Sequence, residues 1–149
     1  MARKAPLPAP EMIGCTCKHL RMATRRLSQI YDRHLEPLGL TITQYSLLAQ
    51  LGAHDGISIG AFAEKLAMDP TTLTRNLRPL QRRGLVLTVA DPRDKRTRGL
   101  HLTVKGRAAR LAAQPVWARA QREIEDAFGH ADTAALHGTL QRLIDRLAS

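Results

Sequence analysis

Two strand-like segments with a cationic turn between them, directly after an amphipathic helix, constrain the fold of this chain more than any other feature. The segments LVLTVA and RGLHLT have the composition of strands, and the stretch between them opens with Asp-Pro, a turn-forming pair. A turn needs no arginine, yet Asp91 to Arg98 contains four cations and only two aspartates. We therefore expect a two-stranded hairpin whose tip contacts an anionic partner.

Positive charge is concentrated in the middle of the chain rather than spread over it. The formal net charge of the 149 residues is +10, and residues 75–107 contain ten Lys or Arg against two Asp. Localised positive charge favours a polyanion such as nucleic acid. The N-terminus carries prolines where a signal peptide needs an apolar run, and no stretch approaches the ~20 apolar residues of a membrane span. We expect a cytoplasmic protein without membrane association.

The chain divides into a central unit and helices on either side of it. An N-terminal segment rich in Pro and Ala predicts a disordered arm, and helical spacing of apolar residues starts from Met12. A second helical region follows Thr103 and is interrupted at Pro115, and a last helix begins at Asp132. The predicted boundaries are an arm at 1–11, a helical layer at 12–40 and 104–149, and a central unit at 41–103.

Three short helices are expected inside the central unit, each with a recognisable N-cap. Thr41 and Gln44 form a capping-box pattern, and Ser58 precedes the next apolar run. Asp69 followed by Pro70 starts the third helix, which contains a further proline. The hairpin completes the unit. The predicted fold class is therefore mainly α with a small β-wing, a winged helix-turn-helix flanked by long helices.

The third of these helices has two chemically different faces. Leu73, Leu77 and Leu80 share one side of a helical wheel, and hydroxyl and guanidinium groups occupy the other. Exposed N–H groups at a helix start attract phosphate, and arginines further along can reach guanine edges in a major groove. This pattern predicts a recognition helix. Its predicted DNA contacts are Thr71, Thr72, Thr74, Arg75 and Arg78.

The hairpin after this helix is placed to act as a wing on the flanking DNA. Arginine suits a narrow minor groove, where the negative potential is enhanced, so Arg93 and Arg96 are the predicted contacts. Asp91 and Asp94 each precede one of these arginines by two residues. We expect the two carboxylates to hold the guanidinium groups in extended poses.

Three stretches of the sequence resemble the MarR (multiple antibiotic resistance regulator) family of winged-helix transcription factors. They are GLTITQYSLLAQL, LAMDPTTLTRNLRPLQRRGLV and DPRDKRTRGLHLTVKG, the last resembling the family's wing signature. The resemblance implies an obligate homodimer in which the first, fifth and sixth helices form the dimerisation layer. It also implies that two winged helices bind the half-sites of a pseudo-palindrome, with Arg96 at the position of the minor-groove arginine.

Dimerisation also has support from the residues themselves. The terminal helices carry apolar stripes that a small central unit cannot cover, and Trp117 and Phe128 add large apolar surface. We favour a homodimer over helices that fold back on their own core.

The stretch CTCKH, near the start of the first helix, leaves three interpretations open. In the first, Cys15 and Cys17 are structural residues. In the second, Cys17 is a redox switch, because the charge of Arg21 one turn later favours its thiolate. In the third, the two thiols and His19 bind a soft metal together with His130 or His137. The resemblance implies that Cys17 and Tyr31 match the reactive cysteine and a partner tyrosine of the organic-hydroperoxide-sensing (OhrR) branch. We expect no metal and no cofactor.

A small aromatic ligand is the other candidate signal, as the resemblance implies a cleft between the dimerisation and DNA layers. The candidate lining residues are Arg21, His34 and Tyr45. No Gly-rich phosphate loop or catalytic triad is recognisable, so we do not expect an enzyme. The predicted function is a homodimeric, operator-binding transcriptional regulator, a repressor by family habit, that is released by a small ligand or thiol oxidation. The alternatives are a sequence-tolerant architectural DNA-binding protein and a protein-interaction adaptor.

Overall fold

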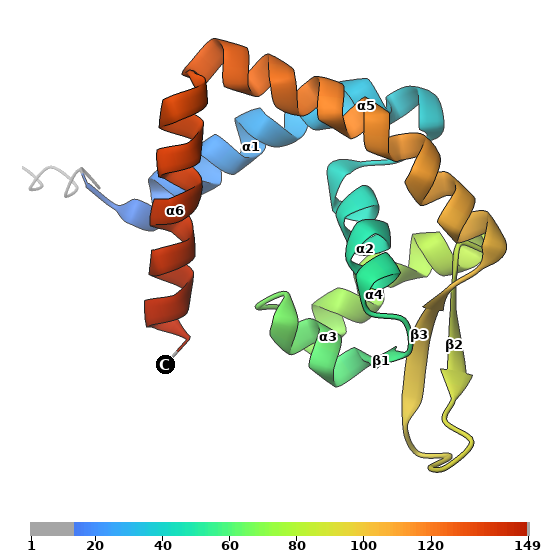
Figure 1. Cartoon of the computed structure of the whole chain (residues 1–149). Helices are drawn as coiled ribbons and strands as arrows, with labels where there is room; N and C mark the ends of the chain where they lie inside the picture. The colour runs from blue at the N-terminus through green and yellow to red at the C-terminus, as the bar shows by residue number, and fades with distance from the viewer. Residues whose placement is uncertain (1–13, 149) are drawn as a thin grey trace, which may run out of the picture.

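The fold is a small winged lobe joined to a layer of long helices (Figure 1). The computed structural model describes residues 14–148, so the arm predicted at residues 1–11 lies outside the described residues. The elements are α1 (Thr16–Leu35), η1 (Glu36–Leu38), α2 (Ile42–Ala53), β1 (Ile57–Ser58), α3 (Ile59–Lys65), α4 (Pro70–Arg82), β2 (Val86–Ala90), β3 (Arg98–Leu102), α5 (Val104–Phe128) and α6 (His130–Leu147). Figure 1 shows α1 and α5 crossing above the lobe, with α6 at the end away from the hairpin. The predicted fold class is confirmed.

The predicted N-caps start their helices by satisfying backbone donors that have no partner inside the helix. Thr41 and Gln44 form the reciprocal capping box, with both hydrogen bonds at 3.2 Å. The Ser58 hydroxyl accepts from the Ala61 N–H at 3.2 Å, and the Thr103 hydroxyl accepts from the first turn of α5. These caps are local in sequence, which is why the starts of α2, α3 and α5 were predictable.

The core of the lobe is leucine-rich and lies where α2, α3, α4 and β3 meet. Leu73, Leu77 and Leu80 are at most 1% exposed, as the wheel for α4 predicts. They pack in one cluster with Phe62 of α3 and Leu35 at the end of α1. The remaining surface of α4 faces outward as a consequence. The core therefore fixes which side of α4 is available to a partner.

The wing is the β2–β3 hairpin of a three-stranded antiparallel sheet with the order β1-β3-β2, in which β3 is the central strand. Val86 pairs with Leu102 and Ala90 pairs with Arg98, which gives the predicted hairpin. The additional strand β1 was not predicted, because two residues are too few to show an alternating pattern. A Cβ on Gly99 would lie 2.8 Å from the Gly56 carbonyl oxygen, so glycine permits this close approach.

The long helices depart from the predicted boundaries at three places. The first helix starts at Thr16 rather than Met12, which lies outside the described residues. Pro115 does not interrupt α5, which is continuous; Ala113 and Ala120, both fully buried, hold the helix on either side of the missing N–H. The last helix starts at His130 rather than Asp132.

A left-handed glycine explains the early start of α6. Gly129 has φ 104°, a region that favours glycine, and it separates the end of α5 from the start of α6. Thr133 then ties the first turn of α6 to the Gly129 carbonyl through its N–H at 2.9 Å and its hydroxyl at 2.8 Å. Within residues 14–148, no helix combines the length and apolarity needed to cross a bilayer.

Candidate nucleic-acid interface

The outward face of α4 forms a cationic surface with a shallow hollow of about 310 Å³. Thr71, Arg75 and Arg78 are exposed there, and Thr74 is half-buried. The leucines on the opposite side are buried in the core, which fixes the rotation of α4 about its axis and keeps the arginines on the surface. The hollow is lined by Pro70, Thr71, Thr74, Arg75 and Arg78. The structure therefore brings together four of the five predicted contacts on α4.

The N-terminus of α4 is already occupied by a carboxylate of its own chain. Asp69 accepts the Thr72 N–H at 2.9 Å and the Thr72 hydroxyl at 2.5 Å. These hydrogen bonds, the side-chain one first, lower the pKa of Asp69 below its ordinary value. The Thr74 hydroxyl donates to the Pro70 carbonyl at 2.8 Å. Of the three predicted threonines, Thr71 is the exposed one, whereas Thr72 and Thr74 are half-buried and donate their hydroxyls within the chain.

The wing tip is ordered by its aspartates, but by another route than the one predicted. Asp91 accepts the backbone N–H of Arg93 at 2.8 Å, and Asp94 accepts the backbone N–H of Arg96 at 3.0 Å. The prediction that these carboxylates hold the guanidinium groups is therefore wrong. A short Asp side chain reaches a backbone N–H two residues on more readily than the end of a long arginine. The side chains of Arg93 and Arg96 stay exposed.

Polar contacts connect α4 to the wing. Gln81 Nε2 donates to the Thr88 hydroxyl on β2 at 3.1 Å, and the Thr103 hydroxyl donates to the Gly84 carbonyl at 2.6 Å. In Figure 1 the hairpin projects from the lobe, away from the α1–α5 layer. The cationic helix face and the arginine-bearing wing therefore belong to one connected unit.

Comparison with known proteins identifies the unit that carries this surface. The MarR family profile matches residues 40–97. A Mycobacterium tuberculosis transcriptional regulator, MosR, solved in complex with DNA, is 38% identical with a TM-score of 0.71, covering 87% of this chain and 98% of that one. The chain belongs to the MarR family. MarR proteins are not enzymes, and this member is a winged-helix, DNA-binding transcriptional regulator.

Two further relatives extend the comparison. The transcriptional repressor CouR, solved bound to a 23-mer DNA duplex, has a TM-score of 0.81 at 27% identity and covers 93% of this MarR-family chain and 98% of its own. The organic hydroperoxide resistance transcriptional regulator of Bacillus subtilis is 29% identical over 90 residues, which is 60% of this chain. The match spans 61% of the length of that relative.

The three residues predicted to line an effector pocket do not lie together in this MarR-family chain. Arg21 lines a hollow of about 760 Å³ between α1 and α6, and Tyr45 lines a separate hollow of about 450 Å³. His34 instead pairs with Glu123 on α5, with 2.7 Å between His34 Nε2 and the carboxylate. The spacing of residues along a helix cannot show which neighbouring element each one faces.

The hollow at Tyr45 is the aromatic one. The Tyr45 and Trp117 ring centroids lie 6.3 Å apart, and Tyr31 completes the wall. Arg110 lies beside Tyr45; its Nε is buried without a hydrogen-bond partner among the described residues. Burial raises the pKa of Tyr45 and the nearby Arg110 charge opposes that rise. Trp117 was not assigned to a pocket from the sequence, because it comes from α5, far along the chain from Tyr31 and Tyr45.

The candidate redox residues are also separated. Cys17 is exposed in the hollow that Arg21 lines, and Cys15 is the half-buried N-cap of α1. Tyr31 is fourteen positions after Cys17 on one helix, about 21 Å away at 1.5 Å per residue, so the two do not meet within a chain. No group of three or more His, Cys, Asp or Glu in residues 14–148 could hold a metal.

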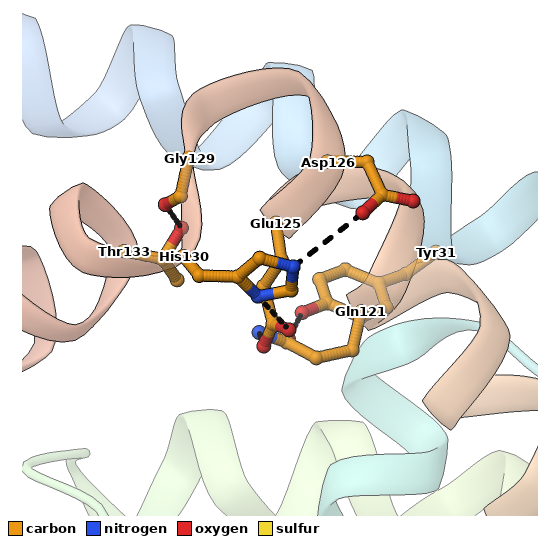
Figure 2. A network of polar contacts seen from close by, with 7 residues as sticks. All are labelled: Tyr31, Gln121, Glu125, Asp126, Gly129, His130 and Thr133. Atoms are coloured by element: carbon orange, nitrogen blue, oxygen red, sulfur yellow. Dashed lines mark hydrogen bonds and ion pairs between the residues drawn. The ribbon is translucent and has the colours of Figure 1, made fainter.

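Tyr31 belongs instead to a polar network that links α1 to the α5–α6 corner (Figure 2). Its hydroxyl donates to Gln121, whose amide donates to Glu125 at 2.8 Å. Glu125 lies 3.2 Å from His130 Nδ1, on the first residue of α6. Burial, and then the Glu125 charge, raise the pKa of Tyr31. This network was not predicted, since its members are up to about a hundred residues apart.

Proposed function

We propose that this chain is a homodimeric repressor that binds a pseudo-palindromic operator and leaves it when an effector binds. One observation carries the proposal: the outward Arg75–Arg78 face of α4 and the exposed Arg93 and Arg96 of the wing belong to one lobe. A repressor role is supported by the similarity to CouR, which is described as a repressor. In each protomer, α4 would enter a major groove and the wing would contact the flanking minor groove.

The homodimer is supported by apolar surface that the single chain leaves uncovered. Met22 of α1 is 53% exposed, Phe128 of α5 is 52% exposed, and Leu147 of α6 is 76% exposed. Scattered exposed apolar residues are ordinary, but most of the large ones here lie on the helices outside the lobe. A second copy would cover them with the same surface, as a two-fold interface requires. Two recognition helices would then reach successive major grooves ~34–36 Å apart.

The proposed effector is a small aromatic acid in the hollow of Tyr31, Tyr45 and Trp117. The walls are aromatic, and the charge of Arg110, which lies behind the lining near enough to act on the Tyr45 hydroxyl, favours a carboxylate. The hollow lies between α1, α2 and α5, so a ligand there would change how the lobe sits on the helical layer. A small rotation suffices to break the half-site register.

Trp117 makes the effector proposal easy to test, since it is the only tryptophan in the chain. Benzoate titrated into the protein should change the intrinsic fluorescence, and uncharged benzamide should bind more weakly. Arg110→Gln should remove the preference for benzoate over benzamide. A fluorescence signal that is equal for both probes in the wild type would contradict an acid-binding hollow.

Thiol oxidation is the second candidate signal, favoured by one specific observation. Cys17 is exposed in an open hollow next to Arg21, and a B. subtilis relative is an organic hydroperoxide resistance regulator. A hydroperoxide should then release wild-type protein from DNA and spare Cys17→Ser, with Cys15→Ser as the matched control. Release of Cys17→Ser to the same extent would assign the effect elsewhere.

The experiment that tests the DNA-binding proposal is selection of duplexes from a random pool, followed by titration of the selected operator. Arg75→Ala or Arg78→Ala should relax base preference by ~1–3 kcal/mol at the contacted pair, and Arg96→Ala should weaken binding. Arg122→Ala is the matched control, because it removes an exposed α5 arginine outside the cationic surface. Unchanged affinity in all three variants would refute the assignment. Selection of no common sequence would favour an architectural protein.

A further inference from the structure

The side chain of Arg83, at the C-terminal end of α4, reaches the turn between α1 and α2. Its Nη1 donates to the Gly39 carbonyl oxygen at 2.5 Å, and Nη2 lies 3.5 Å from the Leu38 carbonyl oxygen. The partners are 44 and 45 positions apart in sequence. The contact therefore joins the cationic helix to the end of the first long helix, across the boundary between lobe and layer.

Arg83 is also held through its own backbone, which fixes the origin of the side chain. It is the C-cap of α4, and its N–H donates to the Pro79 carbonyl at 3.2 Å. Lys105 in the first turn of α5 donates to the Arg83 carbonyl at 3.0 Å. Three elements thus meet at one residue: α4, the first turn of α5 and the α1–α2 turn.

The receiving side has a shape that suits a guanidinium group. Gly39 ends η1 in the left-handed region at φ 64°, and its N–H donates back to the Glu36 carbonyl at 2.8 Å. Two successive carbonyls, those of Leu38 and Gly39, are left for an outside donor. Arginine presents several donors in one plane and can reach both, whereas lysine has a single charged nitrogen on a flexible stem.

We infer that Arg83 is a positioning residue that sets the orientation of α4 relative to the helical layer, and thereby the half-site spacing the dimer accepts. The inference rests on the proposed dimer with two recognition helices. The 13 residues of α4 span about 20 Å, so a tilt of about 10° at the Arg83 end moves the other end by about 3.5 Å. That displacement is about one base-pair step of DNA. The side chain reaches toward the layer, so its effect on DNA is indirect.

The test measures discrimination between operators rather than affinity alone. The selected operator is compared with versions in which one base pair is added or removed between the half-sites, for wild type, Arg83→Ala, Arg83→Lys and Arg82→Ala. Arg82→Ala removes the same charge from the adjacent exposed position. Arg83→Ala should reduce the preference for the native spacing about fivefold, the scale of one lost hydrogen bond, with Arg83→Lys between the two. Arg82→Ala should keep the wild-type spacing preference.

The salt dependence of binding separates positioning from a direct phosphate contact. Loss of a phosphate contact reduces the slope of log K against log salt by about one, whereas loss of a positioning contact leaves the slope unchanged. An unaltered spacing preference in Arg83→Ala, an equal loss in Arg82→Ala, or a reduced slope in Arg83→Ala would overturn the inference. Absence of any spacing preference in the wild type would instead contradict the proposed two-half-site dimer, on which the inference depends. Circular dichroism of each variant verifies folding, and Arg83→Lys keeps the test decisive if Arg83→Ala unfolds.

Discussion

The winged lobe and the last helix bury apolar surface in opposite ways. In the lobe, Phe62 and Leu77 are at most 1% exposed, and the cluster around them is closed by the chain itself. In α6, Thr133 is the buried residue, while Ile144 is 55% exposed and Leu147 is 76% exposed. The lobe therefore has a complete core within one chain, and α6 has an apolar stripe that the chain leaves exposed.

The two regions also differ in how far apart in sequence the partners of their polar contacts lie. In the lobe, caps such as Thr41 with Gln44 join neighbouring residues and start helices. At the α5–α6 corner, His130 lies between Glu125 at 3.2 Å and Asp126 at 3.6 Å, and the network continues toward α1 (Figure 2). The polar contacts of the lobe are therefore mainly local in sequence, whereas those at the corner connect three helices.

The largest expected effect is the loss of a core leucine from the lobe. Leu77→Ala should lower the free energy of unfolding by about 2–5 kcal/mol, because the surrounding core cannot fully collapse into the cavity. Leu147→Ala, the matched change on α6, should cost less than about 0.5 kcal/mol at protein concentrations where the chain is monomeric. Urea denaturation followed by circular dichroism measures both. Equal losses would mean that α6 already packs in a core of its own.

The next effect separates α6 as a free helix from α6 as part of an interface. Ile144→Glu places a charge in the apolar stripe and should weaken self-association at least about tenfold, since a buried unpaired charge is costly. Ala135→Glu is the control, because position 135 lies on the opposite side of the helix from position 144. Sedimentation equilibrium gives the two association constants. A similar association constant for Ile144→Glu and wild type would remove α6 from the proposed interface.

Features set by neighbouring residues could be predicted from the sequence, and features set by distant ones could not. The caps of α2 to α5, the buried side of α4 and the hairpin all follow from local patterns, and the family resemblance added the fold that joins them. The third strand was missed because it is two residues long. Pro115 was overestimated as a helix breaker: α5 is continuous through it, and Ala113 and Ala120 on either side are buried by contacts that the local sequence does not show.

The candidate sites show the same limit. The exposed arginines of α4 and the wing lie on the surface where the pattern placed them, and their contacts with DNA stay predictions. The pocket prediction grouped Arg21, His34 and Tyr45, which the structure places apart, because a pocket depends on which elements face each other. Arg83 gained its candidate role from a hydrogen bond across the chain, and Arg110 from the effect of its charge on Tyr45.

A smaller effect is expected at the wing tip, where the hydrogen bond that Asp94 accepts can be separated experimentally from its negative charge. Asp94→Ala should weaken operator binding about fivefold, because the hydrogen bond to the Arg96 N–H that orders the turn is lost. Asp94→Asn keeps an acceptor oxygen and should bind at least as tightly as wild type, since it also removes a negative charge near DNA. Fluorescence anisotropy titrations compare them. Equal weakening of both variants would indicate that the charge itself positions a guanidinium.

The smallest expected effect concerns the polar contact between α1 and α5. Glu123 accepts from His34 and from Arg33, and these hydrogen bonds, the one from His34 first, lower its pKa below the ordinary value of 4.5. A carboxylate with a lowered pKa contributes stability that is fully present above 4.5 and is lost as the pH falls through the lowered value. Glu123→Gln should therefore reduce Tm slightly at pH 7 and flatten its decline below pH 4.5. Asp69 in the lobe also has a lowered pKa, but it is present in both the wild type and Glu123→Gln. The difference between the two Tm profiles therefore reports on the contact of Glu123 with α1. Parallel profiles would show that the exposed Glu123 contributes nothing to the stability of the layer.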